Sequence, residues 1–244
     1  MEIIFLSVQI LLVIIRALIG TAILFHAKKN RIKNLYLLSI YFYGEAFNYI
    51  IFTVSTYLSI VMTPFNHVIL VLFISTALFK DKKNPLWILL IILIPTSIIQ
   101  LTLGGLYYLG INSHILVLYG TEIFNGINLI IVHGSISYAL IGPYRKIRHN
   151  QFVEPRIKTR YLLIILSEIS YGFMGVIYPF YAVDRSAMVA QIILSIFIFL
   201  NIISQSLAWI QPKGLKKWLN RNYNPEVEKD ELSEDEIMKS FMEG

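Results

Sequence analysis

Seven long apolar segments, separated by short polar ones, dominate the pattern of hydrophobic and polar positions along the chain. A helix needs roughly 20 apolar residues to cross about 30 Å of hydrocarbon, and all but the third segment reach that length. The pattern predicts an all-α integral membrane protein built as a seven-transmembrane helix bundle. Its spans are expected at about 3–26, 35–58, 65–79, 85–106, 115–142, 161–182 and 187–210.

Lysine and arginine fall almost entirely on one side of this seven-helix arrangement. They follow the first, third, fifth and seventh segments, whereas the loops around 59–64, 107–114 and 183–186 contain only Arg185. Cytoplasmic loops of membrane proteins carry the excess of positive charge. We therefore expect a multi-pass protein of the cell membrane with its N-terminus outside and its C-terminus in the cytoplasm. A six-helix arrangement, without the short third span, would scramble the charge pattern.

Composition agrees with a chain whose main solvent is the bilayer. Hydrophobic residues make up 56% of it and charged residues only 15%, against roughly 45–50% apolar residues in globular proteins. The chain has no cysteine, which excludes disulfides, thiolate metal sites and cysteine nucleophiles. The net charge of +6 hides an acidic end, because residues 226–244 hold eight acids against Lys229 and Lys239.

The chain divides into three predicted parts. Residues 1–211 form the transmembrane domain, 212–224 an amphipathic interfacial helix and 225–244 an acidic cytoplasmic tail. In the short helix, Leu215 and Trp218 face one way and the lysines another, the pattern of a helix lying on a membrane surface. A plain basic anchor is the alternative interpretation.

The tail contains a capping box, formed by Ser233 and Glu236, before a short apolar stretch. We expect this tail, or the basic loop at residues 144–160, to bind a cytoplasmic protein partner. A disordered solubilising tail is the alternative.

Ionisable residues inside the spans are the most informative positions, since each costs roughly 2.5–3.5 kcal/mol at a helix centre and so needs a partner or a polar cavity. Arg16 and Glu45 both lie about 15 Å from the cytoplasmic interface at 1.5 Å per residue. Equal depth on consecutive helices predicts a buried pair.

The same depth count brings further polar residues to one layer near the membrane midplane. Pro95, Thr96 and Ser97 of the fourth span lie level with it, and Tyr41 accompanies Glu45 at helical spacing. We interpret the layer as a site for a small ligand, an ion or a proton; a hydrogen-bond network that only fastens the helices is the alternative. The candidate site residues are Arg16, Glu45, Asn48, His133, Glu168 and Asn201.

The fifth span carries a second polar feature nearer its outer end. Glu122 and Asn125 share a helix face with His133. Together with Tyr119, and with Asn66 and His67 of the third span, they are expected to form an outer entrance to the midplane layer. Glu122 reaching to outer water is the alternative.

Known membrane chemistries fit the residues poorly, so we expect no catalytic site and no metal site. The seventh span has no lysine for a retinal Schiff base, and the histidines are too dispersed for a zinc centre. Ser135 lies two residues from His133 on one helix, so the two point apart. No nucleic-acid motif appears, and no cofactor is indicated.

Three functions compete. The first is a receptor or sensor in which the polar layer acts on cytoplasmic loops and tail in signalling. The second is a small transporter or ion channel using the same layer, which a faint parallel repeat between spans 1–3 and 5–7 would suit. The third is a structural membrane subunit whose polar layer only fastens the helices. Separately, Gly172 and Gly175 give the sixth span a small-residue face on which another helix can pack closely.

Overall fold

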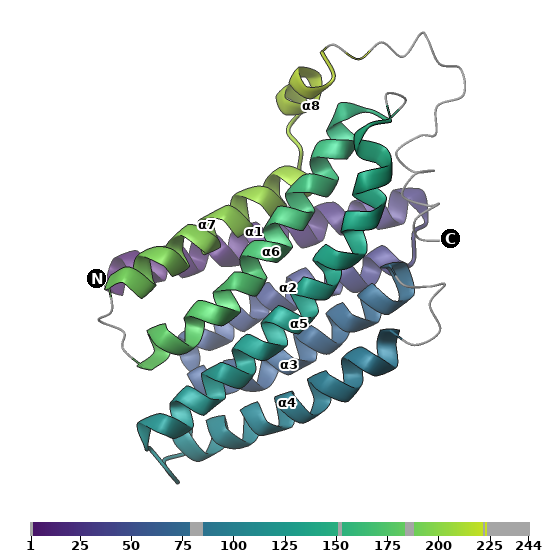
Figure 1. Cartoon of the computed structure of the whole chain (residues 1–244). Coiled ribbons are helices and arrows are strands. Elements are labelled where there is room, and N and C mark those ends of the chain that lie inside the picture. Colours follow the sequence, from purple (N-terminus) through teal and green to yellow (C-terminus); the bar gives the residue numbers. More distant parts are fainter. Residues whose placement is uncertain (1, 79–84, 151–152, 184–187, 222, 224–244) are drawn as a thin grey trace.

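The protein folds as a bundle of long helices (Figure 1). The computed structural model describes residues 2–78, 85–150, 153–183, 188–221 and 223, and those ranges contain helices and no strands. The elements are α1 Glu2–Asn30, α2 Asn34–Val54, α3 Thr56–Phe73 with a π-helical turn η1 Ile74–Leu78, α4 Pro85–Tyr108, α5 Ile115–Arg148, α6 Pro155–Val183, α7 Met188–Trp209 and α8 Lys213–Leu219.

Seven helices, α1 to α7, are long and apolar enough to cross a membrane. Large apolar side chains such as Phe65, Ile91 and Phe199 are exposed on the outside of the bundle. Continuous exposed apolar surface of this kind is typical of contact with lipid. Over the described residues, the prediction of an all-α chain with seven apolar helices long enough to cross a membrane is confirmed.

The third helix is longer than the sequence pattern suggested. It was expected at 65–79, but the apolar helical segment runs from Thr56 to Leu78, and Ser55 caps its start by accepting a hydrogen bond from the Leu58 amide. Pro64 lies inside the helix. A proline removes one backbone hydrogen bond, but a helix packed among neighbours tolerates that loss.

The segment expected as a basic loop at 144–160 is largely helical. Helix α5 continues to Arg148 and α6 begins at Pro155. The basic residues at the ends of α1, α5 and α6 lie at one end of the bundle, here called the basic end, because consecutive helices alternate in direction.

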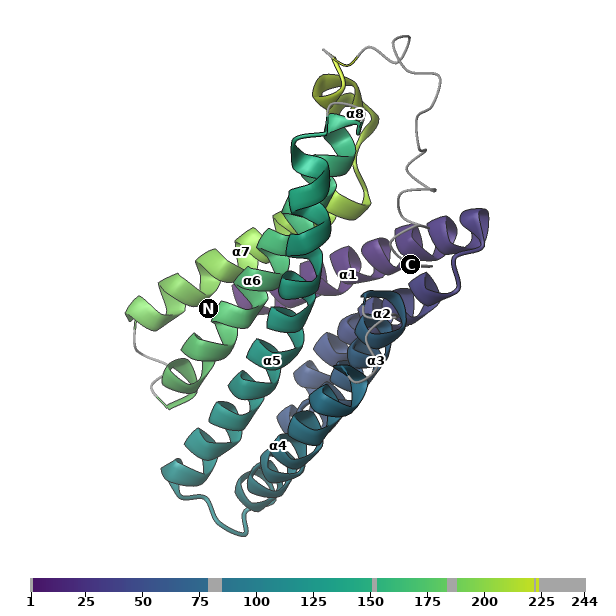
Figure 2. The ribbon, with the colours of Figure 1, turned by 45° about the vertical axis from the view of Figure 1, so that its right-hand side comes forward.

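Each helix from α1 to α7 packs against the next in order, and α7 also contacts α1, so the bundle closes on itself. Helix α3 contacts α5 across the interior. Two three-helix groups, α1–α3 and α5–α7, therefore face each other, with α4 packed against α3 and α5. Toward the basic end, α5 and α6 diverge from α1–α3 (Figure 2).

Helices α5 and α6 cross closely at a pair of glycines. A Cβ on Gly126 would overlap the carbonyl oxygen of Gly175, and one on Gly175 would lie 2.5 Å from the Gly126 carbonyl oxygen. Gly175 therefore acts as the small-residue contact predicted for the sixth span. Gly172 does not, because a Cβ there would meet nothing within 4 Å.

The interfacial helix expected at 212–224 is shorter than predicted, since α8 ends at Leu219. Trp218 is 57% exposed, and the Arg221 guanidinium lies 5.2 Å from the centre of its ring. The acidic tail at 225–244, with Ser233 and Glu236, lies outside the described residues.

Candidate functional site

Polar side chains from six helices meet in the middle of the bundle, in a group that we call the central cluster. All except the partly buried Tyr171 are buried, in a setting where an isolated charge is costly. The cluster consists of Arg16 of α1, Glu45 of α2, Asn66 and His67 of α3, His133 of α5, Glu168 and Tyr171 of α6, and Asn201 and Gln205 of α7.

Arg16 is the cation of the central cluster and is only 2% exposed. Its guanidinium donates to the side-chain oxygen of Asn201 at 2.8 Å and to that of Gln205. It also lies 5.5 Å from the ring centre of Tyr171 and 5.6 Å from that of Phe42, within the range of a cation–π interaction. Arg16 thus joins α1 to α7 and α6.

Glu45 takes its hydrogen bonds from α3 and α6. The Tyr171 hydroxyl donates to it at 2.7 Å and the Asn66 amide at 3.3 Å. Arg16 and Glu45 are both buried in this cluster, as the predicted pair requires, but no direct hydrogen bond or ion pair joins them within the described part of the chain. Tyr171 contacts both the guanidinium and the carboxylate, which still interact through their charges.

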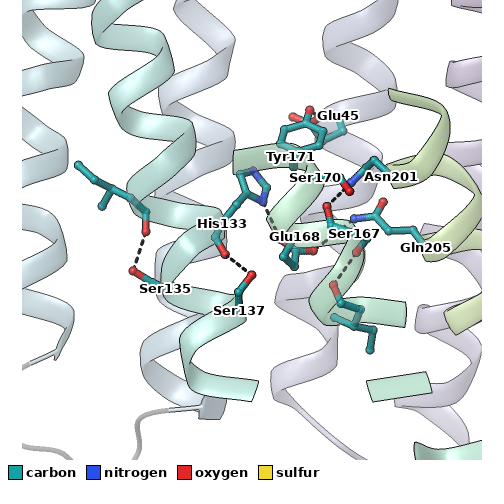
Figure 3. Close-up of polar contacts among 12 residues, drawn as sticks. Glu45, His133, Ser135, Ser137, Ser167, Glu168, Ser170, Tyr171, Asn201 and Gln205 are labelled. Atoms are coloured by element: carbon teal, nitrogen blue, oxygen red, sulfur yellow. Dashed lines mark hydrogen bonds and ion pairs between the residues drawn. The ribbon is translucent and has the colours of Figure 1, made fainter. Parts of the chain in front are cut away.

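His133 and Glu168 form a short polar contact between α5 and α6 at the centre of the cluster (Figure 3). The His133 Nδ1 atom lies 2.6 Å from Glu168 Oε2. The other carboxylate oxygen accepts from the Gln205 amide at 3.3 Å. Because Gln205 also accepts from Arg16, an unbroken chain of contacts runs from Arg16 through Gln205 and Glu168 to His133.

The glycine crossing sets the register of this contact. Gly126 precedes His133 by seven residues, and Gly175 follows Glu168 by seven. In two antiparallel helices the same offset from a shared crossing point brings residues level, and seven residues correspond to about two turns. The close approach at Gly126 and Gly175 therefore places His133 directly against Glu168.

The second nitrogen of His133 finds no hydrogen-bond partner among the described residues. Its ring lies 4.2 Å from the Tyr171 ring and 6.4 Å from the His67 ring, centre to centre. His67 is equally buried, and its Nδ1 is also unpartnered within the described part of the chain. Two imidazoles with spare hydrogen-bonding capacity, His67 on α3 and His133 on α5, thus lie edge to face.

The polar residues of α4 join a separate strip and do not extend the central cluster. Asn128 of α5 donates to Gln100 at 2.9 Å and to Ser97 at 3.4 Å, and Thr96 contacts Asn128 at 2.5 Å. Depth placed Thr96 and Ser97 level with the layer, but their side chains point toward α5 on the outer flank.

The expected outer entrance belongs partly to this strip. Asn125 accepts from Gln100 at 3.3 Å and donates to Glu122 at 3.4 Å, so these residues face α4. Tyr119, which precedes Glu122 by three residues, is half-buried. Asn66 and His67, expected at the entrance, are instead members of the central cluster.

Asn48 lies on α2 one turn from Glu45 and contacts α3. Its amide donates to the Thr63 hydroxyl at 3.2 Å, and its Oδ1 has no partner within the described ranges. The structure therefore unites five of the six predicted site residues through the contacts described above and leaves Asn48 at the margin.

The structure also bears on two chemistries that the sequence disfavoured, an activated serine and a metal centre. Ser135 lies on the face of α5 away from Glu168, with its hydroxyl on the Ile131 carbonyl (Figure 3). His133 is therefore not placed to activate it. In the described part of the chain, no group of three His, Cys, Asp or Glu residues is arranged to hold a metal ion.

At the basic end, a second polar group ties α6, α7 and α8 together; we call it the α6–α8 latch. Arg160 donates to the Ala208 carbonyl at 2.9 Å and to Gln211 at 3.4 Å. Gln211, which follows α7 with a φ of 36° in the left-handed region, donates back to the Arg156 carbonyl at 3.3 Å. Contacts that hold a non-glycine residue in this region are characteristic of functional or structural junctions.

Helix α8 is held by the remaining contacts of the α6–α8 latch. Asn220 accepts from the Arg156 amide at 3.2 Å and donates to Glu154 at 2.9 Å. Partial burial, and after it the charges of Arg156 and Arg160, lower the pKa of Lys216. The residues of the latch are thus Glu154, Arg156, Arg160, Gln211 and Asn220.

Sequence reasoning missed Tyr171 and the latch as site components, and it left Gln205, noted at helical spacing from Asn201, out of the candidate site residues. A signal existed for Tyr171 and Gln205, because Tyr171 lies three residues after Glu168 and Gln205 four after Asn201, which places them on the same helix faces. The latch joins residues from distant segments, and nothing in the local pattern marks it.

Comparisons with known proteins give no match: no family model, no curated protein and no solved structure is significantly similar to this chain.

Proposed function

We propose that the chain is a seven-helix membrane receptor or sensor that binds a proton or a small polar ligand at the central cluster and signals through its basic end. The observation that carries the proposal is that the same two helices take part in both the central cluster and the α6–α8 latch. Helix α6 supplies Glu168 to the central cluster and Arg160 to the α6–α8 latch. Helix α7 supplies Gln205 to the cluster, and its Ala208 carbonyl accepts from Arg160 just before Gln211. A change in the cluster contacts of either helix therefore acts on the latch.

The proposed orientation has the basic end in the cytoplasm and the N-terminus outside, in the cell membrane. It is supported by the basic residues at the ends of α1, α5, α6 and α8, which follow the positive-inside rule. Helix α8, with its exposed Trp218 and its lysines, then lies at the cytoplasmic lipid surface. A protein partner would dock there, at the ends of α5 and α6 or on the tail. A non-enzymatic role is part of the proposal.

Packing of the central cluster between the two three-helix groups supports a switching role over simple fastening. Arg16 contacts α7, Glu45 contacts α6, and His67 faces His133 of α5. Every one of these contacts joins α1–α3 to α5–α7. A charge change in the cluster alters how the two groups are held, and buried polar contacts of two groups form a bistable element that a ligand can bias.

A small transporter or proton channel is the second candidate, favoured by the facing imidazoles of His67 and His133 beside two carboxylates. Histidine and carboxylate chains of this kind serve as proton relays in pumps and transporters.

Flux through reconstituted liposomes separates the two candidates. With a pH-sensitive and an ion-sensitive dye inside, the receptor is expected to leave an imposed gradient decaying as in protein-free liposomes. A transporter would dissipate it faster, and Glu168→Gln would slow that decay. Glu122→Gln, in the strip between α4 and α5, is the matched control. Flux that depends on Glu168 and not on Glu122 would replace the receptor by the transporter.

A further inference from the structure

The formal charges of the central cluster do not balance. Arg16 contributes one positive charge, while Glu45 and Glu168 contribute two negative ones. The other groups packed around them are neutral in their ordinary states: the imidazoles of His67 and His133, and the phenols of Tyr41, Tyr49 and Tyr171 that interact with the Arg16 charge. Helix α7 supplies the uncharged amides of Asn201 and Gln205. The sum is one negative charge.

An unbalanced charge at this position is unfavourable. A buried ion that lacks its partner costs several kcal/mol, and the charged residues Arg16, Glu45 and Glu168 are each no more than 6% exposed. One further positive charge would bring the sum to zero.

The contact between His133 and Glu168 is where a proton fits best. At 2.6 Å between Nδ1 and Oε2, the pair can hold one proton beyond that of a neutral imidazole, either as imidazolium with carboxylate or as imidazole with carboxylic acid. The proton belongs to the pair as a unit. His67 limits the number, since a second positive imidazole 6.4 Å away would repel the first.

We propose that the central cluster binds one exchangeable proton on the pair of His133 and Glu168, and that this proton neutralises the second carboxylate. The inference deepens the proposed receptor function, on which it rests for its biological meaning, by naming the proton as the ligand of the site. Release of the proton restores the negative charge between α1–α3 and α5–α7.

The test is the pH dependence of unfolding of the full-length protein in mixed micelles of lipid and dodecyl sulfate. Above about pH 7 an unfolded histidine, whose ordinary pKa is about 6.5, is neutral. The folded protein then holds one proton more than the unfolded chain, so stability falls as the pH rises. The unfolding equilibrium constant is expected to increase about tenfold per pH unit until the proton is lost.

Charge-neutral variants make the test specific. Glu45→Gln brings the cluster to zero charge without the extra proton, so the alkaline dependence should disappear. Glu168→Gln gives the same expectation by removing the other carboxylate, and it serves if the first variant does not fold. Glu122→Gln also removes a buried carboxylate from α5, but it lies outside the cluster and should keep the wild-type dependence.

A wild-type equilibrium constant that does not change above neutral pH, or an unchanged dependence in Glu45→Gln and Glu168→Gln, would overturn the proposal. The experiment contains no signalling output and no gradient. A failure here therefore leaves the receptor standing with another ligand, and a failure of the receptor in the flux assay leaves the bound proton standing.

Discussion

Replacing Arg16 with methionine is expected to lower the free energy of unfolding by about 3–5 kcal/mol, the cost of breaking a buried charge network by removing one partner. The variant keeps the volume of the side chain but removes the donors to Asn201 and Gln205 and the cation over Tyr171. Two carboxylates then remain in the central cluster without their cation. Reversible unfolding in mixed micelles measures the loss.

Arg145→Met is the matched control, because Arg145 is exposed at the basic end and should change stability by no more than about 0.5 kcal/mol. Adding Glu45→Gln to Arg16→Met should recover part of the loss, with a coupling of about 0.5–3 kcal/mol. Equal effects of Arg16→Met and Arg145→Met would show that the cluster does not depend on this charge.

Gly126→Ala is expected to destabilise the protein by about 1–3 kcal/mol, the range for overpacking a tight contact. The added Cβ would overlap the Gly175 carbonyl oxygen. The helix backbones fix the positions of both atoms, so neither can move aside by a side-chain rotation. The helices must separate, which also lengthens the contact between His133 and Glu168 that this crossing sets. The same unfolding measurement gives the size of the effect.

Gly134→Ala provides the comparison on the same helix. A Cβ at Gly134 would meet nothing within 4 Å, so the exchange should be neutral or stabilising by up to about 1 kcal/mol, as for glycine in an open helix position. If both alanine variants behaved alike, the close crossing of α5 and α6 would be wrong.

The number of helices and most members of the central cluster follow from the sequence, because span length and the cost of a buried charge leave few choices. Arg16, Glu45, His133, Glu168 and Asn201 were found by depth alone. Depth along an axis comes from counting residues, which requires no tertiary information.

The neighbour toward which each side chain points around its helix axis could not be predicted in the same way. Thr96 and Ser97 have the depth of the cluster but turn toward Asn128, and Tyr171 intervenes between Arg16 and Glu45. Both results depend on how neighbouring helices pack, as does the tolerance of α3 for Pro64. The latch joins Arg160 and Gln211, which are close in space but far apart in the sequence.

The distance between the basic ends of α1 and α5 tests most directly the claim that the central cluster controls that end. The chain has no cysteine, so spin labels at Lys28→Cys and Lys146→Cys, both exposed positions, report on these two helices alone. We expect Glu168→Gln to shift the measured distance distribution by about 1–2 Å or more, the scale of helix shifts in switching proteins. Glu122→Gln should leave the distribution unchanged. Identical distributions for wild type and Glu168→Gln would contradict the coupling on which the proposed receptor depends.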